Sequence, residues 1–360
     1  MKKPSQMAEI SEIIELIANP LNTANLILSV VSFFINSFHL IVLTRKSICS
    51  SSTNWLMIGI AISDIATLFL TVEKHLVLLD IERDECVTSD SLLGIYIGVF
   101  SWALQDFFRR CSTWLALLMA IIRILIIRNA LDKKLSKPSF GRFLVALIFV
   151  FASIPSVFYY LRFQVLENSR IPLPISCDEF QDIDAFPKYR LQLMTLFRLE
   201  NQLVLRVYLM VNAVISKFLP CLCFPPCTFL LIRALRSAKN KSNVSSTDEK
   251  SDPTTKLVIL VTIAFFLAEA PLGIIITIQA FFHKNNALIT ASVDTVSVFT
   301  CLLTINSTLH FFMCVFLSRQ YRKTVKRLLK WEKFEKMVGL SKNRVSKETR
   351  HGSSFMVRLP

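Results

Sequence analysis

Seven apolar runs divide this chain, and each is long enough to cross a lipid bilayer. A transmembrane helix needs about 20 apolar residues, whereas a strand of a membrane barrel would alternate over about 10. Buried helices of a soluble protein would each keep a polar face, and a mean hydropathy of +0.51 leaves little polar surface for one. The runs, all predicted to be transmembrane helices, are Ala24 to Leu43, Trp55 to Val72, Leu92 to Ile127, Phe143 to Leu161, Val207 to Ile232, Leu257 to Phe282 and Ala291 to Leu317.

The third run is interrupted by charge, so it could form one helix or two short spans. Asp106, Arg109 and Arg110 lie in its middle. Two spans would need a turn between them, yet no glycine or proline lies near Arg109. We therefore predict a single helix whose first turns lie outside the hydrocarbon.

The basic residues predict how the bundle is oriented. The segments on one side of the spans hold 26 Lys and Arg against 7 Asp and Glu, and those on the other side hold 11 against 15. Cytoplasmic segments are rich in Lys and Arg, so the first side is predicted to be cytoplasmic. The N-terminus then lies outside and the C-terminus inside, which requires an odd number of spans. The net charge of +15 is accounted for by segments that face anionic lipid, and no nucleic-acid partner is expected.

A basic amphipathic segment follows the last span. Between Arg319 and Val338, Lys and Arg alternate with apolar residues at spacings of three and four, a pattern typical of a helix lying along the inner leaflet. We therefore predict four regions, which are an extracellular N-terminus (1–22), a seven-helix transmembrane domain (23–317), a membrane-surface helix (318–338) and a disordered cytoplasmic tail (339–360).

Of the nine cysteines, only Cys86 and Cys177 fall in segments predicted to lie outside. In an oxidising compartment one pairing is available to them, so we expect a disulfide that ties the loop before the third span to the loop after the fourth. The cluster of Cys221, Cys223 and Cys227 lacks a fourth ligand and is expected to pack in its apolar span. No metal site and no cofactor is predicted.

Polar side chains within the spans are the candidates for function, because each is costly in lipid unless it meets a partner or lines a cavity. Asp106 can pair with Arg109 or Arg110 at helical spacings of three and four. This group has two interpretations: an ion pair that only sets helix rotation, or the floor of a ligand pocket in which Glu269 competes for the same guanidinium groups. The full set is Asn36, Asp64, Asp106, Arg109, Arg110, Arg123, Lys217, Glu269, Asp294 and His310.

Several of these residues stand in patterns that resemble the rhodopsin-like G protein-coupled receptors. The patterns, in chain order, are Asn36, Thr53-Asn54, Ile60 to Asp64, Arg123, Pro220, Phe265-x-x-x-Glu269-x-Pro271, Asn306 to Cys314 and Ser318 to Arg322. The departures from that family are Ile122-Arg123-Ile124 for Asp/Glu-Arg-Tyr, Glu269 for the sixth-span Trp, and His310 to Cys314 for Asn-Pro-x-x-Tyr. With these departures, about residues 25 to 330 resemble the nematode serpentine receptor class w family, which is itself similar to invertebrate FMRFamide-like peptide receptors.

The resemblance implies a receptor of the plasma membrane that signals through a heterotrimeric G protein. The residues predicted to lie near the ligand are Trp102, Gln105, Asp106, Arg109, Arg110 and Glu269. The resemblance assigns to activation and G protein coupling Asn36, Asp64, Arg123, Pro220, Phe265, Pro271, Asn306, His310 and Cys314. Pro220 and Pro271 should also kink their helices, because proline removes a backbone donor and clashes with the preceding turn.

A peptide is the predicted ligand, from the family likeness and from the long outer loop 162–206 with its mixed charges. An environmental small molecule is the alternative, and an amine is disfavoured because Gln105 stands where amine receptors have Asp. A transporter or channel would also use intramembrane charges, but there is no internal repeat, and 7 glycines in 360 residues are few for broken helices. The five histidines are scattered, so no enzyme is expected.

Overall fold

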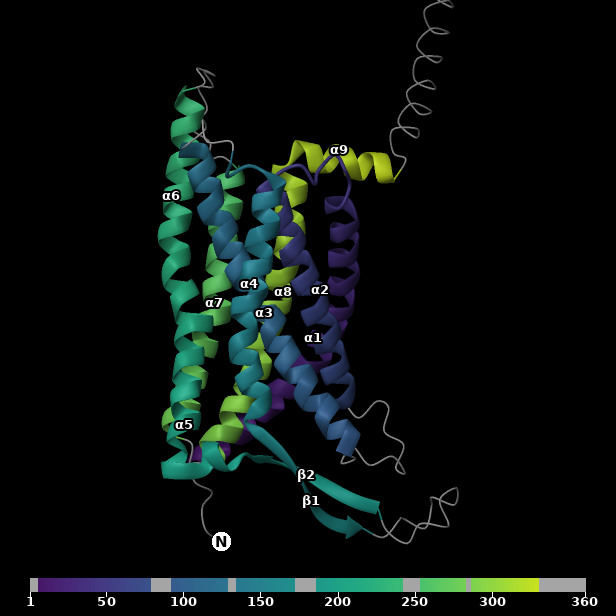
Figure 1. Cartoon of the computed structure of the whole chain (residues 1–360), viewed down its shortest axis with the longest axis vertical. Coiled ribbons are helices and arrows are strands. Elements are labelled where there is room, and N and C mark those ends of the chain that lie inside the picture. The colour runs from purple at the N-terminus through teal and green to yellow at the C-terminus, as the bar shows by residue number, and fades with distance from the viewer. Residues whose placement is uncertain are drawn as a thin grey trace, which may run out of the picture.

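Seven helices long and apolar enough to cross a membrane pack side by side in the described part of the chain (Figure 1). A computed structural model describes residues 6–78, 92–128, 134–171, 186–241, 253–282 and 286–329. The predicted class, an all-α bundle of seven transmembrane helices, is confirmed. One end of the bundle carries a short surface helix and the other a β-hairpin, and we refer to them as the α9 end and the hairpin end.

Most helices extend several residues beyond the apolar runs that predicted them, since helical structure continues past the hydrocarbon. The helices are α1 (Gln6–Leu43), α2 (Ser52–Leu78), α3 (Leu92–Arg128), α4 (Pro138–Leu161), α5 (Thr195–Ala213), α6 (Leu219–Lys241), α7 (Pro253–Phe281), α8 (Asn286–Leu317) and α9 (Arg319–Leu328). A π-helical segment, η2 (Val214–Phe218), joins α5 to α6, and the three form the fifth span. The charged third run forms a single helix, as predicted.

The stretch predicted as a long outer loop is largely structured. Strands β1 (Phe163–Ile171) and β2 (Phe186–Leu193) form an antiparallel hairpin, and α5 begins at Thr195, well before the predicted start at Val207. The predicted span began too late because Arg198, Glu200 and Arg206 interrupt the apolar pattern in the first part of α5. Glu200, Asn201 and Gln202 hold φ angles of 47°, 58° and 60°, so a left-handed turn interrupts α5 near its start.

The π-helical segment ends at Phe218, two residues before Pro220. Proline cannot donate to the carbonyl four residues earlier, and its ring clashes with that turn, so a widened turn accommodates it. The widened turn faces Lys217 toward α7 at Gly273, where a Cβ would lie 3.0 Å from the Cβ of Lys217. A glycine at this position therefore allows the fifth span to approach α7 closely. Pro271 lies within α7, which continues as a helix on both sides of it.

Helix α1 presents a polar face to its neighbours. Its buried polar residues recur at spacings of three and four, and they are Asn22, Asn25, Ser29, Ser32, Asn36 and His39. Asn25 bonds to His75 of α2 at 2.8 Å and accepts from Thr304 of α8 at 2.8 Å, and Thr308 of α8 donates to Ser32 at 2.8 Å. Hydrogen bonds between helices stabilise packing in lipid, where the hydrophobic effect does not.

Helix α9 crosses the end of the bundle (Figure 1). Ser318 caps it by accepting from the backbone N–H of Tyr321 at 3.1 Å. The buried hydroxyl of Tyr321 bonds to Nδ1 of His39 at 2.8 Å, and burial raises the pKa of this hydroxyl, so it stays neutral. Arg322 donates to the carbonyls of Val315 and Phe316 at the end of α8. The predicted helix ran to Val338, and its part after Leu329 lies outside the described residues.

Candidate functional site

Two cavities lie inside the bundle, and His310 lines both. The α9-end cavity has a volume of about 100 Å³, and the central cavity has a volume of about 40 Å³. The α9-end cavity is lined by His39, Asn54, Met57, Ile60, Met119, Arg123, His310, Met313, Cys314 and Ser318. The central cavity is lined by Asp64, Thr67, Leu68, Thr71, Arg109, Ser112, Thr113, Glu269, Leu303, Thr304, Asn306, Ser307 and His310.

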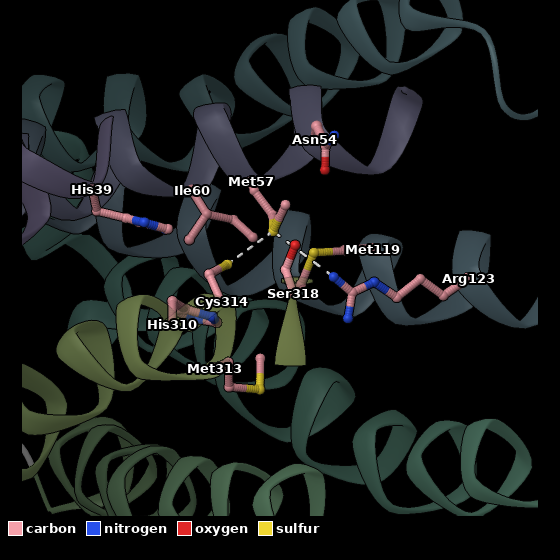
Figure 2. A pocket seen from close by; sticks show the side chains of 10 residues that line it. All are labelled: His39, Asn54, Met57, Ile60, Met119, Arg123, His310, Met313, Cys314 and Ser318. Carbon is pink, nitrogen blue, oxygen red and sulfur yellow. Dashed lines mark hydrogen bonds between the residues drawn. The ribbon is translucent and has the colours of Figure 1, made fainter. Parts of the chain in front are cut away.

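Arg123 reaches into the α9-end cavity from α3 (Figure 2). Its Nη2 donates to the thioether sulfur of Met57 on α2, at a distance of 3.8 Å. Within the described residues no carboxylate pairs with this guanidinium, and its neighbours Ile122 and Ile124 are buried. Sulfur is a weak acceptor, so Arg123 is held far less firmly than it would be in an ion pair.

Three of the predicted coupling residues lie four apart on α8. At this spacing Asn306, His310 and Cys314 share one face of the helix. Asn306 faces the central cavity, Cys314 faces the α9-end cavity, and His310 lies between them. The thiol of Cys314 lies 3.4 Å from the sulfur of Met57 (Figure 2). The structure thus brings Arg123, His310 and Cys314 together around Met57, a residue that the sequence pattern did not single out.

Arg110 is fully buried and fully bonded. It pairs with Asp106 one turn earlier on α3. Its other donors reach Ser216 at 2.8 Å, Asn212 at 3.1 Å, and α4 through the carbonyl of Ala152 at 2.7 Å and Ser156 at 3.1 Å. All five N–H groups of the guanidinium are therefore satisfied, which a buried arginine requires. Arg110 joins α3, α4 and the fifth span, and this arrangement matches the first interpretation of the Asp106 ion pair.

The pocket-floor interpretation supposed that Glu269 contacts Arg109 or Arg110. Among the described residues Glu269 pairs with Lys217 instead. Its Oε2 accepts from Lys217 at 2.6 Å, and its Oε1 accepts from Thr113 at 3.5 Å. The physical reason lies in the fifth span, because η2 brings Lys217 against α7 while Arg110 already has all its partners. Glu269 is 1% exposed and Lys217 is 5% exposed, so the pair is buried between two helices.

Asp64 and Arg109 face the central cavity with unsatisfied atoms. Oδ1 of Asp64 accepts from Ser112 at 2.6 Å, but its Oδ2 has no partner in the described structure. The same holds for Nε of Arg109 and Oδ1 of Asn306. A volume of about 40 Å³ can hold roughly three waters, which would supply these hydrogen bonds. Gln105, nearby on α3, donates to Thr71 at 2.8 Å.

The remaining predicted residues are more dispersed. Phe265 is buried and packs against Phe224 of α6 with ring centroids 4.3 Å apart. Asn36 is buried and donates to the carbonyl of Ser32 in its own helix. Trp102 is 43% exposed and lines neither cavity, whereas its neighbours Ser101 and Ala103 are buried, so its side chain faces away from the bundle. Cys86 and Cys177 lie outside the described residues.

The sequence analysis included Lys217 among the intramembrane polar residues but gave it no partner, and it did not single out Met57. Lys217 carried a signal, since it is the lone charge in the fifth run, and a lone buried cation implies a carboxylate on a neighbouring span. Met57 carried none, because methionine in an apolar run indicates only packing.

Seven apolar spanning helices, an intramembrane polar cluster and an amphipathic helix after the last span define a seven-transmembrane receptor. The family model of the serpentine type 7TM GPCR chemoreceptor Srw matches residues 23–332. The chain therefore belongs to this family and is a multi-pass G protein-coupled receptor of the plasma membrane. A search of curated proteins finds no match.

Proposed function

We propose that this receptor binds an extracellular peptide of the FMRFamide-like class and activates a heterotrimeric G protein at its α9 end. The observation that carries the coupling step is the position of Arg123, which lines an open cavity at that end with only a thioether as its partner. The resemblance of its surroundings to the G protein-contacting arginine of related receptors supports the same role.

The α9 end is assigned to the cytoplasm on the distribution of charge. The polar face of α9 is basic, and its exposed cations are Arg319, Arg322, Lys323, Lys326 and Arg327. Such a face suits the anionic inner leaflet. The hairpin end, with β1 and β2, then faces outward and is the side from which a ligand arrives.

Activation is proposed to be a two-state change of the bundle. A ligand that binds one arrangement more tightly shifts the population toward it. In the active arrangement the α9 end of α7 would move away from α3 and enlarge the cavity around Arg123. Because the Arg123–Met57 contact is weak, little energy opposes the release of the guanidinium, and some signalling without ligand is expected.

A small environmental molecule is the second candidate ligand. The description of the matching family as chemoreceptors favours it. The two ligand classes are separable by experiment, because pools of amidated peptides and fractionated small-molecule extracts can be applied to the same cells expressing the receptor with a panel of chimeric G proteins.

Arg123→Ala tests the coupling mechanism. We expect this variant to abolish G protein activation while surface level is preserved, because the Arg123 side chain lines an open cavity and forms no ion pair with any described residue. Arg128→Ala is the matched control, since Arg128 lies in the last turn of the same helix and is exposed. Similar, mild effects of the two substitutions would reduce Arg123 to an interfacial anchor.

A further inference from the structure

The α9-end cavity is unusually rich in soft metal-binding atoms. The side chains on its walls that carry sulfur or imidazole are His39, Met57, Met119, His310, Met313 and Cys314. His39 is already engaged, because its Nδ1 bonds to Tyr321. The described residues contain no group of three or more His, Cys, Asp or Glu that could hold a metal ion. A site with three protein ligands among these described residues would therefore need thioether sulfur.

His310 and Cys314 are arranged as a chelating pair. They lie four residues apart on α8, the spacing that places two ligands on one helical face. His310 makes no hydrogen bond in the described part of the chain, and both side chains line the same cavity. The Cys314 thiol is free and buried.

Met57 completes the set from a second helix. Its sulfur lies 3.4 Å from that of Cys314, close enough for both to bind one ion. Figure 2 shows the two sulfurs facing each other, with the His310 ring next to Cys314. Met119 and Met313 line the same cavity, so a further thioether is available.

We propose that Cys314, His310 and Met57 form a binding site for a soft monovalent metal ion, Cu(I). Thiolate and thioether ligands select Cu(I), and imidazole suits it as well. Binding replaces the S–H bond of Cys314 with an S–Cu bond and releases the proton to solvent. The ion and the thiolate then carry no net charge, so Arg123 beside Met57 does not oppose binding. A divalent ion would leave a net positive charge next to this guanidinium.

The site lies where the receptor is proposed to couple, although the binding itself does not depend on that function. The metal would compete with Arg123 for the sulfur of Met57, at present 3.8 Å from Nη2. Occupancy would thus change how Arg123 is held.

Purified full-length receptor should be titrated with Cu(I) under anaerobic reducing conditions, with bicinchoninate as the competing chelator. We expect the wild type to retain one equivalent that Cys314→Ala and Met57→Leu lose. Met57→Leu conserves volume, so it tests the ligand without disturbing the packing. Mutation of a residue that only hydrogen-bonds to a metal ligand typically lowers metal affinity by roughly 10- to 100-fold. Loss of a direct ligand should lower the Cu(I) affinity by more than this. X-ray absorption should show both sulfur and imidazole around the ion.

Cys301→Ala is the matched control, because Cys301 is a free, half-buried cysteine on the same helix. It should leave the stoichiometry unchanged. The proposal is overturned if the wild type loses all copper to the chelator, or if Cys314→Ala and Met57→Leu bind normally. Coordination by sulfur alone that is lost in Cys223→Ser would place the metal at the cluster of Cys221, Cys223 and Cys227. That result would also overturn the proposal. If the receptor bound Zn²⁺ as tightly as Cu(I), and this binding also required Cys314, the proposed selectivity for Cu(I) would be refuted.

Discussion

Two adjacent arginines of α3 show how strongly position on a helix decides the role of a side chain. Arg110 is 3% exposed and directs all its donors to protein atoms, so it is a structural centre. Arg109 points about 100° away around the helix and lines the central cavity, and its buried Nε finds no partner among the described residues. Of the two, Arg109 is the residue available to a ligand or to ordered water.

The buried pair of Lys217 and Glu269 provides a test at this scale. Lys217→Met leaves a carboxylate uncompensated, and Glu269→Leu leaves an ammonium uncompensated. Each should destabilise the receptor by about 3–5 kcal/mol, because removing one partner of a buried pair exposes the desolvation cost of the other. The measurement is thermal unfolding of the purified receptor, together with surface level.

The double variant Lys217→Met/Glu269→Leu serves as the control. It removes both charges and should recover most of the stability that either single variant loses. If the two losses simply add, the residues act separately and the 2.6 Å contact carries no coupling.

Among the elements, α9 shows how a surface helix is fixed to a bundle. It is amphipathic, but its attachment depends on side-chain contacts that its own sequence does not reveal. Tyr321 bonds to His39, Thr324 contacts Ser47 at 3.2 Å, and Arg322 reaches the end of α8. Helix α9 is thus tied to α1 by Tyr321 and His39, which lie 282 residues apart in the sequence.

Tyr321→Phe tests this attachment. The change removes one hydroxyl and leaves Nδ1 of buried His39 unpaired, so it should cost about 1–3 kcal/mol of stability. Differential scanning calorimetry of the purified receptor measures this loss of stability. Tyr96→Phe is the control because Tyr96 is 43% exposed. Since burial raises the folded-state pKa of Tyr321, the contribution is complete below the ordinary tyrosine pKa of about 10 and declines only above it. An unchanged midpoint in Tyr321→Phe would contradict the anchoring role.

At the scale of the whole molecule, the predicted disulfide would join the loop before α3 to the segment after α4. Cys86→Ser and Cys177→Ser should each lower surface expression to a similar extent, and the double variant should be no worse than either. Non-reducing mass mapping of the purified receptor would identify the linkage. Additive losses would show that the two cysteines act independently.

Much of the architecture followed from the sequence, and the failures have identifiable causes. The seven spans and the unbroken third helix were predicted, since lipid requires every spanning segment to be apolar and helical over a known length. The hairpin and the early start of α5 were not, because outside the membrane no such length rule applies. The polar face of α1 is visible in the sequence as polar residues at spacings of three and four. Only Asn36 was singled out from it as a candidate.

For the candidate site, too, one part could be predicted from the sequence and another part could not. The sequence by itself determined which charges are buried in lipid, because membership of an apolar run is a local property of the chain. Only the tertiary structure decided which charges meet, since partners depend on helix rotation and on how closely spans approach. Lys217 reaches Glu269 because a π-helical turn and Gly273 bring two spans together, and Arg123 meets Met57 because α2 packs beside α3.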